Sequence, residues 1–222
     1  MWCCIKFNFN FAEFDLPEKH EAFDAHANPQ DKDFMNDILC REAAHLRGTG
    51  KALILDGCEH LTTHALRRSG FTDANIVIAN SNESTCAALQ ACLPQVDVRF
   101  CSMIDCLESP AQERFAVVYL DYCGSFGGRQ STCAPSYEME LLFSKKLNER
   151  AIVAYTFCKR TAVRMDPSIP DSELAWRTFQ HIACKYGYVT RNVASRHYRQ
   201  MFTACFRVER IATTSDFLMR DM

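Results

Sequence analysis

The sequence lacks a strong charge of either sign and begins without a long apolar run. Its 25 Lys and Arg residues nearly balance 27 Asp and Glu residues, which leaves a formal net charge of −2. This balance does not indicate a surface that coats nucleic acid throughout, so a polyanionic partner would need a local basic patch. The opening residues 1–14 (MWCCIKFNFNFAEF) contain one Lys and no long apolar stretch, so we expect neither a signal peptide nor a membrane span there.

The 13 cysteines form no C-x-x-C pair and no Cys/His ladder of the zinc-finger type. Several lie inside apolar runs, where a free thiol packs as a small hydrophobe: Cys40, Cys86, Cys92, Cys101, Cys184 and Cys205. Free thiols are typical of reducing compartments, so we expect an intracellular protein of the cytoplasm or nucleus and not a disulfide framework.

Apolar strands and amphipathic helices alternate along the chain. Alternation of Phe residues with polar ones predicts a short strand over residues 7–11, and residues 31–47 are predicted to form a helix. Core strands are predicted at 51–56, 75–80, 96–101, 116–121 and 151–157, helices at 62–71, 83–93, 137–147 and 172–187, and two closing strands within 188–210. Continuous apolar strands between helices indicate an α/β fold, a three-layer sandwich around a mostly parallel sheet with an antiparallel last strand.

The length favours one domain with an extension. At 222 residues the chain can bury one sizeable core. We expect an N-terminal extension over residues 1–49, whose helix packs on the core, and a single domain over residues 50–222. Nothing in the sequence predicts the oligomeric state.

Polar side chains end three of the predicted strands: Asp56, Asn80 and Asp121. Because the carboxyl ends of parallel strands share one edge of a sheet, these side chains are expected at the same edge. A carboxylate there costs desolvation unless it has a partner, which a ligand with hydroxyl and ammonium groups would supply. The alternative is that Asp56 and Asp121 cap the turns and helices that follow them.

The order of elements and these strand-end residues resemble the class I S-adenosylmethionine (SAM) dependent methyltransferases, over about residues 50–210. The resemblance implies a seven-stranded sheet with SAM at its carboxyl edge. It implies that Asp56 and Gly57 lie near the methionine end of SAM, that Asn80 accepts a hydrogen bond from the ribose, and that Asp105 lies near the adenine amino group. The loop DGCEHLTT departs from the family's glycine-rich pattern, because Gly57 is its only glycine.

The segment LDYCGSFGG, residues 120–128, matches the position of the family's catalytic or substrate-facing loop. The resemblance implies that Asp121 and Tyr122 face the transferred methyl group, where Asp121 would orient or deprotonate the acceptor. Nucleic acid is favoured over a protein or small molecule as acceptor, because a basic cluster follows the fifth core strand. The residues expected to contact the acceptor are Cys123, Lys159, Arg160 and Arg164. A second basic cluster, Arg196, His197 and Arg199, is expected at a strand connection.

Three other interpretations stay open. Cys123 and Cys158 loosely resemble the two cysteines of RNA cytosine-5 methyltransferases, in which the later one is the nucleophile. The glycine-poor first loop instead favours a non-catalytic binding or scaffold protein with a degenerate methyltransferase fold. His60 and His64, beside Glu59, share a helical face, but no third ligand is evident, so we expect a solvated turn and no metal site.

Overall fold

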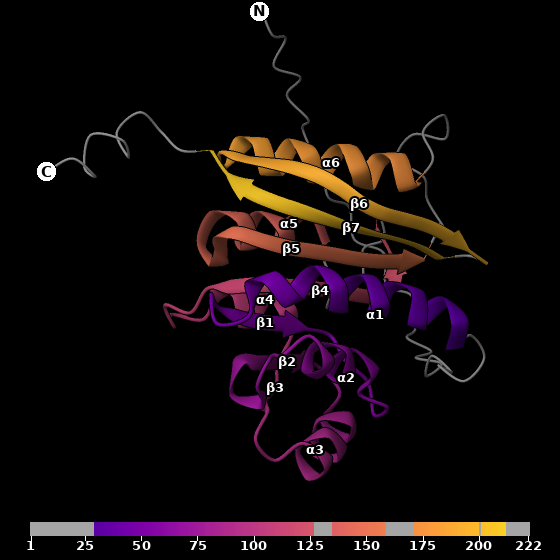
Figure 1. Cartoon of the computed structure of the whole chain (residues 1–222), viewed down its shortest axis with the longest axis vertical. Coiled ribbons are helices and arrows are strands. Elements are labelled where there is room, and N and C mark those ends of the chain that lie inside the picture. The colour runs from indigo at the N-terminus through magenta and orange to yellow at the C-terminus, as the bar shows by residue number, and fades with distance from the viewer. Residues whose placement is uncertain (1–28, 127–134, 159–170, 200, 212–222) are drawn as a thin grey trace, which may run out of the picture.

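The computed structural model describes residues 29–126, 135–158, 171–199 and 201–211 of the chain. One sheet forms the centre of the molecule, with its strands in the order β3-β2-β1-β4-β5-β7-β6 (Figure 1). The strands are β1 (Lys51–Ile54), β2 (Ile76–Asn80), β3 (Asp97–Phe100), β4 (Phe115–Ser125), β5 (Leu147–Cys158), β6 (Tyr188–Tyr198) and β7 (Met201–Arg210). The helices are α1 (Pro29–Ala43), α2 (Leu61–Arg68), α3 (Glu83–Cys92), α4 (Met103–Glu108), α5 (Pro135–Leu141) and α6 (Asp171–Lys185).

Strand directions follow the prediction. The strands β1 to β5 pair in parallel, whereas β7 is antiparallel to both of its neighbours, β5 and β6. The chain crosses between parallel strands through helices, which is the connection that parallel pairing requires. The predicted seven-stranded α/β fold is therefore confirmed, including the antiparallel strand that ends the sheet.

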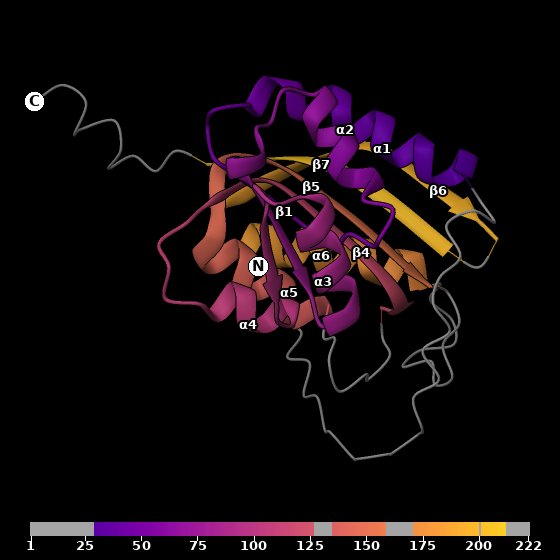
Figure 2. The ribbon, with the colours of Figure 1, turned by 90° about the horizontal axis from the view of Figure 1, so that it is seen from below.

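Helices lie on both faces of the sheet (Figure 2), and an apolar core fills the space between the sheet and the helices on each side. On one face, α1 and α2 pack over the strands through buried residues such as Leu39 and Leu66. On the other face, α4, α5 and α6 bury residues such as Leu107, Met139 and Phe179. Successive side chains of the inner strands point to opposite faces and so contribute to both cores, which is why these strands are nearly continuous apolar runs in the sequence. The three layers of the prediction are present.

Several boundaries differ from the sequence prediction. The helix α4 was not predicted: it has 6 residues, and it begins with a capping box in which Ser102 and Asp105 bond each other's backbone N–H groups. The strand β4 continues past Asp121 to Ser125, and β5 begins at Leu147 because a short π-helical segment over 142–146 ends the helix before it. The strand predicted over residues 7–11 lies outside the described residues.

The described part of the chain contains no helix that is both long and apolar enough to cross a membrane. Its cysteines are free thiols, and Cys86, Cys106 and Cys205 are buried. Burial raises the pKa of the Cys205 thiol to about 12, so this thiol stays protonated and packs as an apolar group.

Candidate cofactor and acceptor site

Asp56 lies just beyond the end of β1 and is buried. Its Oδ2 accepts hydrogen bonds from the Thr63 backbone N at 2.9 Å and from the Thr63 hydroxyl at 2.8 Å. Its Oδ1 accepts from the Gly57 backbone N at 3.2 Å. Thr63 belongs to the first turn of α2, whose N–H groups have no partner within the helix. The carboxylate therefore holds the start of α2 against the end of β1, which is the capping role expected as the alternative to ligand binding.

The loop between β1 and α2 is open on one side. A Cβ atom at Gly57 would meet nothing within 4 Å, so a ligand can approach the backbone there. His60 takes a left-handed conformation with φ 42°, and its Nδ1 lies 2.9 Å from the Cys58 carbonyl oxygen. The rings of His60 and His64 lie 4.7 Å apart, and burial together with nearby positive charge lowers the pKa of His64. Among the described residues, no group of three or more possible ligands could hold a metal ion.

Asn80 joins the ends of the two neighbouring strands β1 and β2. Its Nδ2 donates to the Asp56 carbonyl oxygen at 3.1 Å, and its Oδ1 accepts from the Asn82 backbone N at 2.8 Å. Because an amide oxygen has two lone pairs, Oδ1 can accept one more hydrogen bond. The structure thus brings Asp56 and Asn80 together, as the sequence predicted, and shows that each also supports its own loop.

Phe100 ends β3 and is the feature of this edge that sequence analysis missed. Its side chain is 60% exposed, although it is a large aromatic residue. Phe100 pairs in register with Asn80, and paired residues on neighbouring strands point to the same face of a sheet. The only sequence signal is an aromatic residue at the end of a predicted strand; its exposure depends on β3 being the outermost strand.

Asp105 lies in the first turn of α4, close in sequence to Phe100. Its Oδ2 accepts hydrogen bonds from the Ser102 backbone N at 3.2 Å and from the Ser102 hydroxyl at 2.6 Å. The residue is exposed, and its Oδ1 atom makes no hydrogen bond among the described residues. Asp105 therefore caps its own helix and keeps one oxygen available to a ligand.

Asp121 and Tyr122 are neighbours in β4 and point to opposite faces of the sheet. Asp121 is half-buried, pairs in register with Thr156 of β5, and shares its face with Tyr119. Burial, and then the charge of Asp121, raises the pKa of Tyr119. The Tyr122 ring instead lies in the core beneath α4 and α5, where its buried hydroxyl has no hydrogen-bond partner among the described residues. The structure does not bring the Tyr122 hydroxyl to the side chain of Asp121.

Cys158 ends β5 beside the connection between β6 and β7. It pairs in register with Met201 of β7, so Arg199, in the preceding turn, lies near the end of β5. The second basic cluster lies only in part at a strand connection: Arg199 is in the turn between β6 and β7, as predicted, whereas Arg196 and His197 belong to β6 and pair with Thr203 and Phe202 of β7. The first basic cluster, Lys159, Arg160 and Arg164, and the side chain of Cys123 lie outside the described residues.

A hollow of about 280 Å³ lies at the opposite, amino edge of the sheet. It is lined by residues 48–51, Asn75, Glu113 and Arg114. None of the residues predicted to bind a cofactor or acceptor lines it, so this hollow is separate from the candidate site at the carboxyl edge.

The fold is that of the class I SAM-dependent methyltransferases, because solved structures of such enzymes superimpose on most of the chain. Trm1 from Pyrococcus horikoshii in complex with SAM matches with a TM-score of 0.60 and 11% identity, over 82% of this chain and 56% of that one. Magnesium protoporphyrin IX methyltransferase from Synechocystis with bound SAM matches with a TM-score of 0.53 and 13% identity, over 82% of this chain and 79% of that one. A protein from Pyrococcus horikoshii proposed to be an RNA methyltransferase has a TM-score of 0.51 and 11% identity, over 81% of this chain and 83% of that one.

Sequence comparison adds no closer relative. No protein-family model matches the chain, and no curated protein matches it. Identities of this size establish the shared fold, and the chemistry has to be argued from the residues of the site.

Proposed function

We propose that this protein is a SAM-dependent methyltransferase whose acceptor is a nucleic acid. The observation that carries the proposal is the set of hydrogen-bond acceptors at one edge of the sheet, which Asp56, Asn80 and Asp105 provide. In open α/β sheets ligands bind outside the carboxyl ends of the strands. The same fold occurs in the two SAM complexes described above.

The residues of this edge fit the chemical groups of SAM. The cofactor presents donors, namely an ammonium group, two ribose hydroxyls and an adenine amino group, and the edge presents acceptors. Asp56 and the open backbone at Gly57 would bind the methionine end of SAM. The remaining lone pair of Asn80 Oδ1 would accept a hydrogen bond from a ribose hydroxyl, and Oδ1 of Asp105 would accept one from the adenine amino group. Phe100 offers an exposed ring against which adenine can stack.

Bound SAM would supply a methyl group activated on a positively charged sulfur. The protein's part is then positioning, since methyl transfer depends on an in-line arrangement of donor and acceptor. Asp121 lies at the carboxyl edge, and its carboxylate can accept a hydrogen bond from an acceptor N–H or O–H, orient it and take up its proton. Tyr122 would contribute through its ring in the wall below, because its hydroxyl is buried in the core.

The preference for a nucleic acid rests on positive charge beside the acceptor end of this edge. Arg199 lies in the turn beside the end of β5, and Arg196 lies on β6, with β7 between it and β5. The chain that leaves β5 carries Lys159, Arg160 and Arg164. Phosphate groups supply the matching negative charge. One protein with this fold is a proposed RNA methyltransferase, whereas another acts on a porphyrin, so the fold alone does not select the acceptor.

A non-catalytic binding protein is the second candidate. Asp56 and Asn80 already bond to the loops beside them, and the first loop keeps a single glycine, which are the features expected after loss of the cofactor. The cytosine-5 mechanism remains a third, minor candidate through Cys158, which is half-buried at the end of β5.

Methyl transfer from SAM with a labelled methyl group tests the proposal. The protein is incubated with separate pools of RNA, DNA, protein and small metabolites, and label is counted in each. We expect label in a nucleic-acid pool, and loss of it in the Asp121→Asn variant. Label in the protein or metabolite pool would contradict the nucleic-acid acceptor, and no label together with no SAM binding would favour the non-catalytic protein.

A further inference from the structure

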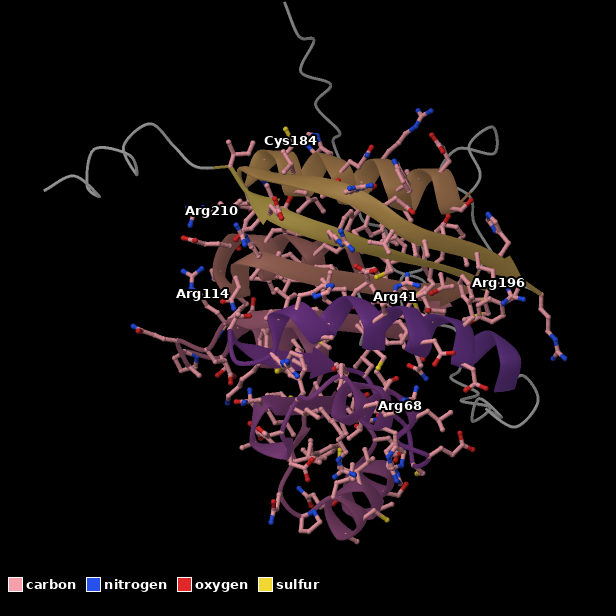
Figure 3. All side chains as sticks on the ribbon, viewed as in Figure 1. Arg41, Arg68, Arg114, Cys184, Arg196 and Arg210 are labelled. Carbon is pink, nitrogen blue, oxygen red and sulfur yellow. The ribbon has the colours of Figure 1, made fainter. Side chains whose placement is uncertain are left out.

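The outer end of the sheet exposes a face that carries several arginines. In Figure 1, α1 crosses in front of β4, and α6 lies behind β6 and β7, while no described helix lies in front of β6. On the α1 side, Cys205 of β7 is buried in the core, whereas side chains further out, such as that of Arg191 of β6, are exposed. We call Arg41, Arg191, Arg196 and Arg207 the arginine face; Figure 3 shows Arg41 and Arg196 on this side of the molecule.

Two of these arginines lie directly opposite each other. Arg191 of β6 and Arg207 of β7 are register partners, and both are exposed. Like charges directly opposite on neighbouring strands are destabilising. Among the described residues Arg191 makes no hydrogen bond or ion pair, so no carboxylate is bonded to its guanidinium group. Arg191 therefore costs folding free energy through its repulsion from Arg207.

One buried carboxylate is shared by two other arginines of the face, Arg41 and Arg207. Glu42 of α1 accepts hydrogen bonds from Arg207 Nε at 2.7 Å and from Arg41 Nε at 3.1 Å. Burial alone would raise the pKa of Glu42, but the hydrogen bonds from Arg207 and Arg41 outweigh it and hold this pKa below its usual value, so the group is ionised. A single negative charge is thus shared by two guanidinium groups, and a positive charge is left over.

A second acidic residue of this surface reduces the positive charge without cancelling it. Glu209 of β7 pairs in register with Arg150 of β5, and its charge also acts on Arg207. Two carboxylates, Glu42 and Glu209, therefore stand against four arginines, namely Arg41, Arg150, Arg191 and Arg207. A hollow of about 190 Å³ lies beside Arg191 and is lined by residues 189–191, Arg207 and Glu209. The excess positive charge therefore borders a depression in the surface.

The arginine face continues toward the carboxyl edge of the sheet. Arg196 points to the same side as Arg191, about 15 Å further along β6 at the usual rise of a strand. Its guanidinium lies 5.0 Å above the centre of the Phe34 ring of α1, which holds the arginine over the surface. Arg199 follows in the turn beside the end of β5. The positive charges thus form a line from the outer face to the edge where Asp121 lies.

We propose that the arginine face binds the phosphates of single-stranded nucleic acid and leads the strand to the acceptor end of the carboxyl edge. The choice of nucleic acid among polyanions rests on the proposed function. Arginine suits this task because its fork of donors matches phosphate oxygens and its charge persists at all physiological pH values. Exposed, regularly placed guanidinium groups give affinity through the backbone without base specificity.

Fluorescence anisotropy with a labelled oligouridine strand tests the proposal on the full chain. Arg191→Gln and Arg196→Gln should each weaken binding about fivefold, and each should reduce the salt slope of log K by about 0.7, the value for one lost phosphate contact to a single strand. Arg177→Gln is the matched control, since Arg177 is an exposed arginine of α6 on the opposite side of the sheet. It should change affinity less than twofold. Circular dichroism should show all three variants folded, with Arg191→Gln no less stable than the parent.

The outcomes separate this proposal from the proposed function. No binding of the strand, or equal losses in all three variants, overturns the arginine face as a nucleic-acid site. Arginine-dependent binding to anionic vesicles or to polyglutamate, without binding to the strand, overturns it as well. Calorimetry with SAM reports on the proposed function independently, because neither Arg191 nor Arg196 belongs to the predicted cofactor residues. A protein that binds the strand but not SAM would keep the arginine face and lose the methyltransferase.

Discussion

Asp56 and Thr63 are joined by two hydrogen bonds, one from the backbone N–H and one from the hydroxyl, that fasten α2 to the end of β1. The acid that the fold would place near a cofactor is thus also the cap of the helix beneath it. A carboxylate has enough lone pairs for both tasks. Structural and ligand-binding roles of Asp56 are therefore separable only by paired variants.

The pair Thr63→Val and Asp56→Ala makes this separation. Thr63→Val removes one hydrogen bond and should lower the free energy of unfolding by about 1 kcal/mol while leaving SAM affinity unchanged. Asp56→Ala removes the cap as well and should cost about 1–3 kcal/mol of stability, with a loss of SAM affinity of similar size. Urea denaturation and calorimetry measure the two quantities. Equal SAM affinity in folded Asp56→Ala and the parent would leave Asp56 as a cap alone.

Phe100 should contribute to SAM binding through its exposed ring. Phe100→Ala is expected to weaken the binding of SAM and of its demethylated product by about 1–3 kcal/mol, the range for stacking of a base on an aromatic ring. Stability should change little, because the side chain is 60% exposed. Phe100→Tyr keeps the ring and serves as the control, with near-parental affinity. A Phe100→Ala protein that binds both ligands like the parent would show that adenine lies elsewhere.

The protein should be at least as stable without the Tyr155 hydroxyl. Its side chain is fully buried among aromatic rings, including those of Phe179 and Phe206, and its hydroxyl has no hydrogen-bond partner in the described part of the chain. A buried polar group without a partner costs about 1–3 kcal/mol. Tyr155→Phe should therefore keep or raise the melting temperature. Tyr119→Phe is the contrasting variant: the Tyr119 hydroxyl lies 2.9 Å from the Thr156 hydroxyl, so its removal should destabilise the protein. A large drop in the melting temperature of the Tyr155→Phe protein would show that the Tyr155 hydroxyl does make a stabilising hydrogen bond.

Asp121 and Cys158 distinguish two chemistries at the acceptor end. If Asp121 orients or deprotonates the acceptor, Asp121→Asn should keep the fold and the SAM affinity while lowering turnover about a hundredfold or more. Cys158→Ser should then lower turnover only slightly. In the cytosine-5 mechanism Cys158→Ser should instead abolish turnover, because serine cannot supply the thiolate nucleophile at neutral pH. The labelled-methyl assay on the active acceptor pool gives both rates, with calorimetric SAM affinity as the check on folding.

The sheet was predictable from sequence because its strands are buried on both faces. The runs 76–79 and 151–155 are apolar without interruption, a pattern typical of strands that are covered by helices on both faces. The helix α4 was missed because its 6 residues are too few to show a helical period of apolar residues. The spacing of Ser102 and Asp105 is that of a capping box and marks where the helix begins. The boundary between the π-helical segment and β5 depends on tertiary packing, which local sequence patterns do not encode.

The site was predictable in part. Strand-end acids and amides identify the edge, since their positions follow from the strands alone. Which atoms of Asp56 and Asn80 bond to protein groups depends on loop geometry and needed the structure. The pairing of Arg191 with Arg207 depends on the register of β6 and β7, which a bulge shifts near Asn192, so the sequence could not reveal it.

Isothermal titration of the full chain with SAM, and with its demethylated product, tests the central claim most directly. We expect saturable binding of one ligand per chain. The affinity should be weakened by Phe100→Ala and by Asp56→Ala, and unchanged in Thr63→Val. The absence of any heat of binding at millimolar ligand, from a folded protein, would contradict it and leave the non-catalytic binding protein as the remaining interpretation.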